Sequence, residues 1–514
     1  MSKTIIIIGA GLAGLSAALQ AAENGCNVKL VSSLPSERAQ SVMAEGGINA
    51  ALNTKDENDS PEEHFTDTIK AACGLADPNA VWGMTQAAPE LVHWLLKLGV
   101  KFNMSGYDDV DLRNFGGQKK KRTAFAQSDT GKQIMTAMID AVRRKEASGM
   151  VERFSHHSFL TLRLCGNICC GCVIRDEYSQ ETVELPGDAV IVATGGMHGL
   201  FGNTTGSLSN TGEVTAELFR LGVPLANGEM IQYHPTTVKC GGKRMLISEA
   251  ARGEGGRLFA MKDGKQWYFM EEKYPELGNL MPRDITAREI WKVSHESEVF
   301  LDMTEISEEI ISNKLSGLAD DCMTYLHKDI RKEPVSVLPG IHYFMGGILV
   351  DEQHRTPIQN LYAAGECCAQ YHGANRLGGN SLLGALYGGR VAAKSACEQA
   401  DVVDLSCATQ IDFPPASQIS EIKQSNKVMQ DTMGVVRNEN TLLNGIQTVQ
   451  ALTGNLPLLG MAVLKSALAR KESRGAHWRE DYPKSNDDDY LKTTVARFDG
   501  KQIQISFVPV PERR

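Results

Sequence analysis

The chain has 514 residues, of which 42% are hydrophobic and 22% charged, and its formal net charge is −9 at pH 7. This length exceeds one compact core, so we expect two or three domains. The acidic balance argues against a nucleic-acid-binding surface, which needs clustered positive charge. No apolar run approaches the roughly 18 residues that cross a bilayer, and a strand begins directly after Lys3, which leaves no room for a signal peptide. We therefore expect a cytoplasmic chain without direct membrane insertion.

The first elements predict the start of a doubly wound dinucleotide-binding domain. A strand of isoleucines, Thr4–Ile8, leads into the glycine-rich turn 9–14, which is followed by a helix over 15–24 and a second strand over 28–31. A glycine-rich turn between a buried strand and a helix points backbone N–H groups and the positive end of the helix dipole at a phosphate. The surrounding strand and helix make this motif specific for a nucleotide.

The glycines of this turn have separate expected tasks. Gly9 permits the tight turn, Gly11 lets the backbone approach the pyrophosphate, and Gly14 lets the helix pack on the strand. An acidic residue usually follows the second strand and binds the ribose, but here Ser32 stands in that place. A serine hydroxyl can still bind a ribose, more weakly, and the change does not separate FAD from NAD.

Twelve cysteines are spread along the chain, and we expect reduced thiols because no secretory signal is apparent. Four of them are close together: Cys165, Cys169, Cys170 and Cys172. The Cys-Pro that usually completes an iron–sulfur motif is absent. We therefore predict a structural hairpin with its turn at 166–167, and no metal site.

Two later strands belong to the same domain. Residues 188–193 form a buried strand that runs into Thr194-Gly195-Gly196, and residues 360–366 form another. The segment between them is charged, helix-rich and punctuated by prolines, which indicates an inserted domain. Helical patterns then cover 418–433 and 442–452. The predicted fold is α/β: a Rossmann-like nucleotide-binding domain at 1–226 and 341–410, an inserted α+β capping domain at 227–340, and a C-terminal helical domain with a short tail at 411–514.

Several motifs then follow one another in a fixed order along the chain. They are 41–50 (SVMAEGGINA), 115–118 (FGGQ), 232–236 (QYHPT), 248–256 (SEAARGEGG), 282–284 (PRD), 342–347 (HYFMGG), 372–376 (HGANR), 380–383 (NSLL) and 470–477 (RKESRGAH). In this order they resemble the flavoproteins of succinate dehydrogenases and fumarate reductases. The resemblance spans nearly the whole chain, and it implies that the nucleotide-binding domain is a FAD-binding domain.

In that family the FAD pyrophosphate would lie on the glycine turn, with the adenine beside Thr194-Gly195-Gly196. Glu366 and the turn 380–382 would hold the ribose, the ribityl chain and the flavin ring. The cofactor-binding residues implied by the resemblance are Gly9, Gly11, Gly14, Ser32, Gln40, Ser41, Gly46, Gly47, Thr194, Gly195, Glu366, Arg376, Ser381 and Leu382.

One position departs from the family. Succinate dehydrogenases and the membrane-bound fumarate reductases have a histidine bonded to the flavin two residues before the equivalent of Val42, and this chain has Gln40 there. Because an amide cannot make that bond, we expect non-covalent FAD. In the family the covalent bond raises the flavin potential enough to oxidise succinate, so its absence favours fumarate reduction.

A dicarboxylate substrate needs cationic or hydrogen-bonding groups at both ends. By resemblance, Arg376 and His342 would bind one carboxylate, with the arginine offering a bidentate fork. His234 and Ser248 would bind the other. Most members have threonine at the position of Ser248, and serine keeps the hydroxyl.

The proton donor is also implied by the resemblance alone. Arg283 matches the arginine that protonates the second carbon, and Glu249 and Arg252 match the relay behind it. General acid–base chemistry by itself would have pointed to a histidine, because arginine is a weak acid. Taken singly, each of these residues would more often be structural, and only the full set in the family's order indicates an active site.

Three other functions remain open. L-aspartate oxidase shares this fold, but it tends to have an acidic residue in loop 115–118, where this chain has the neutral Gln118 followed by three lysines. Reduction of another enoate acid and a non-catalytic electron-transfer flavoprotein are the others. The chain has no motif for iron–sulfur or haem, so electrons would come from an iron–sulfur subunit, free reduced flavin or a small reductant. Any membrane association would run through such a partner.

Overall fold

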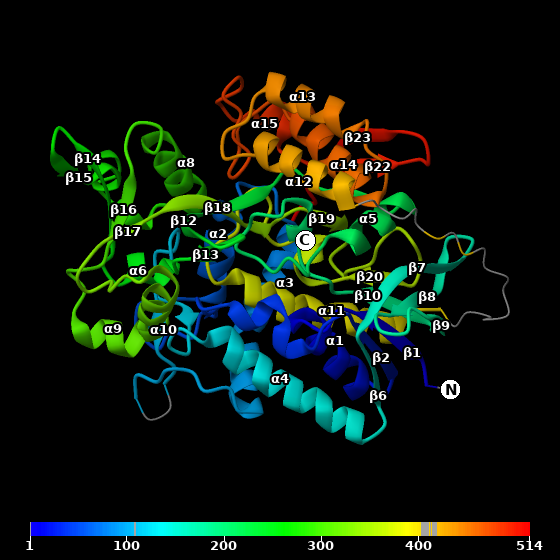
Figure 1. Ribbon diagram of the computed structural model, residues 1–514. Coiled ribbons are helices and arrows are strands. Elements are labelled where there is room, and N and C mark those ends of the chain that lie inside the picture. The colour runs from blue at the N-terminus through cyan, green and yellow to red at the C-terminus, as the bar shows by residue number, and fades with distance from the viewer. Residues whose placement is uncertain (1, 107–108, 402–410, 412, 414–418) are drawn as a thin grey trace.

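The computed structural model describes residues 2–106, 109–401, 411, 413 and 419–514 (Figure 1). A five-stranded parallel sheet, in the order β20-β10-β1-β2-β6, lies at the centre of the nucleotide-binding part. Its strands are Thr4–Ile8 (β1), Asn27–Ser32 (β2), Val151–Ser155 (β6), Ala189–Val192 (β10) and Leu361–Ala363 (β20). The predicted α/β fold with a Rossmann-like domain is confirmed, and β20 joins the sheet although residues 193–360 separate it from β10 along the chain.

The four isoleucines of β1 explain why this strand is central. Ile5 and Ile7 belong to one buried cluster and Ile6 and Ile8 to another, because successive side chains of a strand point to opposite faces. The first face is covered by the helices Leu12–Glu23 (α1), Thr130–Ala147 (α4) and Asn380–Gln399 (α11). A strand buried on both faces reads as a continuous apolar run, as it does here.

A three-stranded antiparallel sheet covers the other face. It consists of His157–Cys165 (β7), Ile168–Asp176 (β8) and Thr182–Pro186 (β9), so the predicted hairpin is confirmed. Cys169 and Cys172 are fully buried in its core. The free thiols are Cys26, Cys73, Cys169, Cys170, Cys172, Cys240, Cys322, Cys367, Cys368 and Cys397. Cys165 is disulfide-bonded, so the expectation of reduced thiols is wrong at that position.

Besides α4, the segment between β2 and β6 holds two further helices and small strands. They are Ile48–Asn49 (β3), Pro61–Ala71 (α2), Pro78–Leu98 (α3), Leu112–Arg113 (β4) and Thr123–Ala124 (β5). Helix α3 begins where the Asp77 carboxylate accepts the N–H groups of Asn79 and Ala80, and it ends at Gly99 with a φ of 101°. An acceptor before the first turn and a left-handed glycine after the last are the usual signals that start and stop a helix.

The predicted capping segment has a hydrophobic core of its own, built from residues between Ile247 and Val337 together with Phe115. Two sheets form it, in the orders β13-β12-β18 and β15-β14-β16-β17. The strands are Ile231–Cys240 (β12), Lys243–Leu246 (β13), Arg257–Lys262 (β14), Lys265–Trp267 (β15), Val299–Asp302 (β16), Val335–Ser336 (β17) and Leu338–Phe344 (β18). The helices are Glu249–Gly253 (α6), Phe269–Lys273 (α7), Arg283–Val293 (α8), Glu308–Lys314 (α9) and Ser316–Asp321 (α10). The domain limits 227 and 340 stay a prediction.

The C-terminal part packs against Glu213–Arg220 (α5). It contains the helices Ile419–Thr432 (α12), Glu439–Val449 (α13), Asn455–Ala469 (α14) and Asp487–Tyr490 (α15). The predicted boundary at 410–411 adjoins residues 402–410, which lie outside the described ones. A hairpin that the sequence analysis did not predict, Lys492–Phe498 (β22) and Ile503–Pro509 (β23), closes the chain. It extends a sheet with Leu225–Ala226 (β11), Gly347–Leu349 (β19) and Cys368–Ala369 (β21).

Among the described residues, none of the helices combines the length and the apolar character that crossing a bilayer requires.

Candidate active site

A cavity of about 890 Å³ lies at the carboxyl edge of the central sheet, where the capping segment faces it. Its walls include the first residues of α1 and α11, the ends of β2 and β10, and parts of β12, β13 and β18. Doubly wound sheets bind ligands at this edge. Of the predicted residues, those that line it are Gly9, Gly11, Ser32, Gln40, Ser41, Gly46, Gly47, Thr194, Gly195, His234, Ser248, Glu249, Arg283, His342, Glu366, Arg376, Ser381 and Leu382. Gly14 and Arg252 lie behind the lining.

The glycine turn shapes the wall at the start of α1. Gly9 has a φ of +109°, and a Cβ on Gly14 would lie 1.8 Å from the Gly9 carbonyl oxygen, so only glycine lets α1 start this close to β1. A Cβ on Gly11 would meet nothing closer than 3.7 Å. Open space at Gly11, next to the N-terminal end of a helix, fits the approach of a pyrophosphate to the backbone.

Ser32 lies at one end of the cavity, where β2 ends. Its Oγ is buried and has no hydrogen-bond partner among the described residues. A buried hydroxyl without a partner costs about 1–3 kcal/mol, so this atom is suited to a ligand hydroxyl such as that of a ribose.

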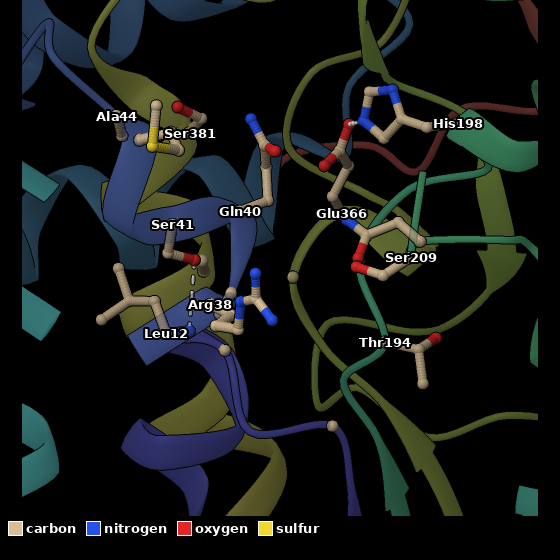
Figure 2. A pocket seen from close by; sticks show the side chains of 18 of the residues that line it. Leu12, Arg38, Gln40, Ser41, Ala44, Thr194, His198, Ser209, Glu366 and Ser381 are labelled. Atoms are coloured by element: carbon tan, nitrogen blue, oxygen red, sulfur yellow. Dashed lines mark hydrogen bonds and ion pairs between the residues drawn. The ribbon is translucent and has the colours of Figure 1, made fainter. Parts of the chain in front are cut away.

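Segment Gln40–Met43 (η2) forms another wall, from which Gln40 projects in Figure 2. The Ser41 Oγ accepts the Leu12 N–H at 3.3 Å, which ties this segment to the start of α1. Gly47 has a φ of +132°, and a Cβ there would lie 2.5 Å from the carbonyl oxygen of Ala124. The glycines of motif 41–50 therefore allow close packing against β5 and leave the cavity open.

A row of buried charges ends at the cavity wall in the capping segment. Arg283, the first residue of α8, donates from Nε and Nη2 to Glu249 Oε2, at 2.8 and 2.6 Å. Behind it, Arg252 Nη2 lies 3.3 Å from Glu249 Oε1. Burial raises the pKa of Glu249, but the charges of Arg283 and Arg252 outweigh it and leave this pKa below its ordinary value. Glu249 is therefore an anion held between two guanidinium groups.

Arg376 faces the same space and is joined to Arg283 by a shared acceptor. The Gln232 side-chain oxygen accepts Arg283 Nη1 at 3.1 Å and Arg376 Nη2 at 3.0 Å. The Arg376 guanidinium also lies 4.4 Å from the centre of the Tyr343 ring. Its Nε has no partner among the described residues, and burial, followed by the charge of Arg283, lowers the pKa of Arg376 to about 9. The Arg283 and Arg376 side chains are thus held close together, and the Arg376 Nε remains available as a donor to a ligand.

Two histidines complete this part of the wall. His234 and His342 lie with ring centres 5.2 Å apart, and His342 Nδ1 is 2.8 Å from Thr205 Oγ1. Burial, followed by the charge of Arg283, lowers the pKa of both well below 6.5. His234 Nε2 is buried and has no partner among the described residues, so it is free to meet a ligand. Ser248 caps α6 by accepting the Ala250 N–H at 3.4 Å.

The structure adds residues that the sequence analysis did not assign. Gln232, within the quoted motif 232–236, bridges the two arginines, and His198 faces Glu366 on the wall. Glu45 also lines the cavity; burial, followed by the charge of Asp321, raises its pKa to about 8.

Phe115 of loop 115–118 lines the cavity, whereas Gln118 is held behind it. The Gln118 amide donates to Asn49 Oδ1 and to the Gly378 carbonyl, and Gln118 does not line the cavity. Lys120 and Lys121 pair with Glu63 and Glu57 on the surface. The neutral Gln118 and its lysines therefore offer no argument for or against a substrate ammonium group.

The chain is similar to known flavoproteins over nearly its whole length. The model of the FAD binding domain matches residues 4–382, and the model of the fumarate reductase flavoprotein C-terminal part matches residues 453–513. The chain is 37% identical to the succinate dehydrogenase flavoprotein subunit of Bacillus subtilis, over 100% of this chain and 98% of that one. It is 32% identical to the 8-methylmenaquinol:fumarate reductase flavoprotein subunit of Wolinella succinogenes, over 100% and 92%. The E. coli quinol fumarate reductase structure superposes with a TM-score of 0.90 at 27% identity, covering 99% and 97% of the two chains.

The doubly wound sheet, the glycine turn and the matched FAD-binding model define a FAD-dependent oxidoreductase. The buried arginines on the capping side and the match along the whole chain narrow this class further. The chain belongs to the flavoprotein family of succinate dehydrogenases and fumarate reductases.

Proposed function

We propose that the chain reduces fumarate to succinate with non-covalently bound FAD. The observation that carries the proposal is the row Arg252–Glu249–Arg283, which ends at the cavity wall beside Arg376. A site for a dianion needs positive charge with unused donors, and a reduction across a double bond needs a proton source at the second carbon. The row supplies both.

The FAD would lie along the edge of the sheet. Ser32, at the end of β2, would hold the adenosine ribose, and Gly11 at the start of α1 would meet the pyrophosphate. Glu366, Ser381 and Leu382 would hold the ribityl chain and the ring. At Gln40 the chain has no imidazole that could bond to the flavin, which supports non-covalent attachment and, by resemblance to the family, fumarate reduction as the preferred direction.

The substrate carboxylates would be held by two groups of residues. Arg376 and His342 would bind one carboxylate, and His234 and Ser248 the other. Because burial and Arg283 keep both histidines neutral in the empty site, a bound dianion would favour their protonated forms and so take up protons as it binds.

The reaction needs one hydride and one proton. Reduced FAD, when bound, supplies the hydride to one carbon of the double bond. The electron pair released at the other carbon forms a C–H bond with a proton from Arg283. The neutral guanidine then regains a proton through Glu249, whose Oε2 touches both Nε and Nη2. Arginine can serve as the acid because Glu249 adjoins both Arg283 and Arg252 and can relay a new proton to Arg283.

The relatives from Bacillus subtilis and Wolinella succinogenes are flavoprotein subunits. We propose that this chain likewise receives electrons from a separate partner, such as an iron–sulfur subunit. A free reduced flavin or a small reductant is the alternative donor. The proposed partners therefore are a dicarboxylate and an electron donor.

The test begins with the purified protein loaded with FAD. Acid precipitation should release all yellow colour into the supernatant, because no covalent bond holds the flavin. After anaerobic reduction with dithionite, fumarate should reoxidise the flavin rapidly, whereas L-aspartate should leave the oxidised flavin unbleached. Bleaching by L-aspartate would favour an aspartate oxidase. If neither compound changes the flavin spectrum, the dicarboxylate proposal is wrong, and another enoate acid or an electron-transfer role is the better assignment.

A further inference from the structure

A histidine and a glutamate face each other on the cavity wall, and only the glutamate has been assigned a task. His198 follows the turn at the end of β10, and Glu366 follows β20. His198 Nε2 lies 3.6 Å from Glu366 Oε1 (Figure 2). His198 is only 1% exposed, yet it lines the cavity together with Glu366.

The imidazole ring of His198 is held from several directions. Its Nδ1 lies 3.1 Å from Thr204 Oγ1, which accepts the Gly206 backbone N–H. Since that oxygen accepts one N–H, its hydroxyl proton can point at Nδ1; in the tautomer with this bond, the imidazole proton is on Nε2, toward Glu366. The ring also packs edge-on against Phe344, with centres 5.0 Å apart, and a Cβ on Gly206 would lie 2.2 Å from it.

The Glu366 carboxylate is also fixed by its surroundings. Its Oε1 accepts the Phe344 backbone N–H at 3.1 Å, on the same side as His198. A Cβ on Gly196 would lie 2.7 Å from this oxygen, so the glycine permits its close approach. With Oε1 directed at protein donors, Oε2 is the oxygen left for a ligand.

The order of the strands shows which part of FAD this pair would meet. Along the carboxyl edge of the sheet, Ser32 (β2) is followed by the glycine turn (β1), Thr194 (β10) and Glu366 (β20). With a ribose at Ser32 and the pyrophosphate at the turn, the β20 end faces the other half of the dinucleotide. That half begins with the ribityl chain, which carries hydroxyl donors for a carboxylate.

We propose that His198 is a positioning residue that holds the Glu366 carboxylate in place for the hydroxyl groups of the ribityl chain. The inference rests on the FAD placement given in the proposed function. A charged acceptor fixed in one orientation binds a hydroxyl more tightly than a mobile one, because less rotamer freedom is lost on binding. In a chain whose Gln40 cannot bond to the flavin, FAD affinity depends on such contacts.

The experiment measures the FAD dissociation constant of the apoprotein from the quenching of flavin fluorescence. His198→Ala should raise it about tenfold, because the carboxylate loses the buried neighbour that limits its movement. His198→Gln retains an N–H donor at similar reach and should stay within about threefold of the parent. Thr204→Val frees the ring and should raise the constant about threefold; it serves as the second variant should His198→Ala unfold, which circular dichroism of the apoprotein would reveal.

A double-mutant cycle with Glu366→Gln tests whether His198 acts through the carboxylate. Glu366→Gln should weaken FAD binding at least tenfold, and adding His198→Ala to it should change little further. Two results overturn the inference: an unchanged constant in His198→Ala, or independent effects that multiply in the double variant. If Glu366→Gln alone leaves FAD binding unchanged, the FAD placement itself is wrong. Loss of fumarate reduction as an activity, with the cycle intact, would instead contradict only the proposed substrate.

Discussion

Two groups of buried arginines differ in how many carboxylates surround them. The substrate-side arginines are Arg252, Arg283 and Arg376, and the C-terminal arginines are Arg470, Arg474 and Arg479. Among the described residues, Glu249 is the only carboxylate that forms an ion pair with the first group. Each C-terminal arginine has a carboxylate partner: Arg470 bonds Glu229 and Glu472, Arg474 bonds Glu472 and Asp487, and Arg479 bonds Asp481 through two nitrogens.

The electrostatic consequences are opposite. Burial, followed by the charge of Arg283, lowers the pKa of Arg376 to about 9. Burial also lowers the pKa of Arg474, but its hydrogen bonds to Glu472 and Asp487 outweigh it and leave that pKa raised. A buried cation without an anion is costly, and a structure tolerates it where a ligand supplies the missing charge. The substrate-side arginines are therefore suited to bind an anion, whereas the C-terminal arginines stabilise the fold.

Replacing Arg283 tests the substrate-side group most severely. Arg283→Gln should lower the turnover number about 10³–10⁴-fold, because the residue proposed to give the proton is lost. FAD binding should persist, since Arg283 lies in the capping segment. Fumarate-dependent reoxidation of reduced flavin, measured by stopped flow, checks the first point and the flavin spectrum the second. Turnover above about a tenth of the parent's would remove Arg283 from the role of acid.

Replacing Arg470 is the matched test of the C-terminal group. Arg470→Met should lower the free energy of unfolding by about 3–5 kcal/mol, because Glu229 and Glu472 would each lose a buried partner. The fraction that remains folded should turn over fumarate within about threefold of the parent. Urea unfolding and activity at a low temperature measure the two effects. A large loss of activity in well-folded protein would contradict the division into two groups.

The sequence predicts the start of the nucleotide-binding sheet and the residues of the substrate-side group well. Four consecutive isoleucines before a glycine turn indicate β1, and the order of the motifs indicates which arginines and histidines come together. Helix α1 begins at Leu12, three residues before the predicted start, because the turn leads into the helix without a spacer. The hairpin β22–β23 was missed although Ile503, Ile505 and Phe507 alternate with polar residues, as a half-buried strand requires.

The role of Gln232 could not be predicted in the same way. Its oxygen accepts from Arg283 and from Arg376, which lie 51 and 144 residues further along the chain. Sequence patterns report local periodicity, whereas such a bridge depends on how distant strands and helices pack. The pairing of His198 with Glu366, across 168 positions, is hidden for the same reason.

Giving the substrate-side arginines a second carboxylate should make them resemble the C-terminal ones. Gln232→Glu places an anion between Arg283 and Arg376, so it should weaken succinate binding about 100-fold while raising the melting temperature. Gln232→Leu removes the bridge without adding charge and should weaken binding only about tenfold, the scale of one or two hydrogen bonds. Perturbation of the flavin spectrum by succinate measures both constants. Equal losses in the two variants would show that charge is not what separates the groups.

The smallest expected effect concerns a histidine beside each group. His342 and His477 are both buried next to arginines, and burial, followed by these charges, lowers the pKa of each well below 6.5. Both are neutral when folded but gain a proton on unfolding below pH 6.5, so stability is complete above that pH and is lost as the pH falls through it. Between pH 6.5 and 5.5 each should remove up to about 1.4 kcal/mol from the free energy of unfolding.

Succinate should separate the two histidines. Its carboxylate beside His342 favours the imidazolium and should reduce the acid loss due to that residue. His477 contacts Arg437 and the Arg470 carbonyl oxygen and does not line the cavity, so it should not respond. Urea unfolding at the two pH values, with and without succinate, for His342→Asn and His477→Asn, measures the difference. The succinate-dependent part of the acid loss should persist in His477→Asn and shrink in His342→Asn, where His234 alone still faces a succinate carboxylate. The reverse pattern would place the anion at the C-terminal group and would contradict the division into two groups.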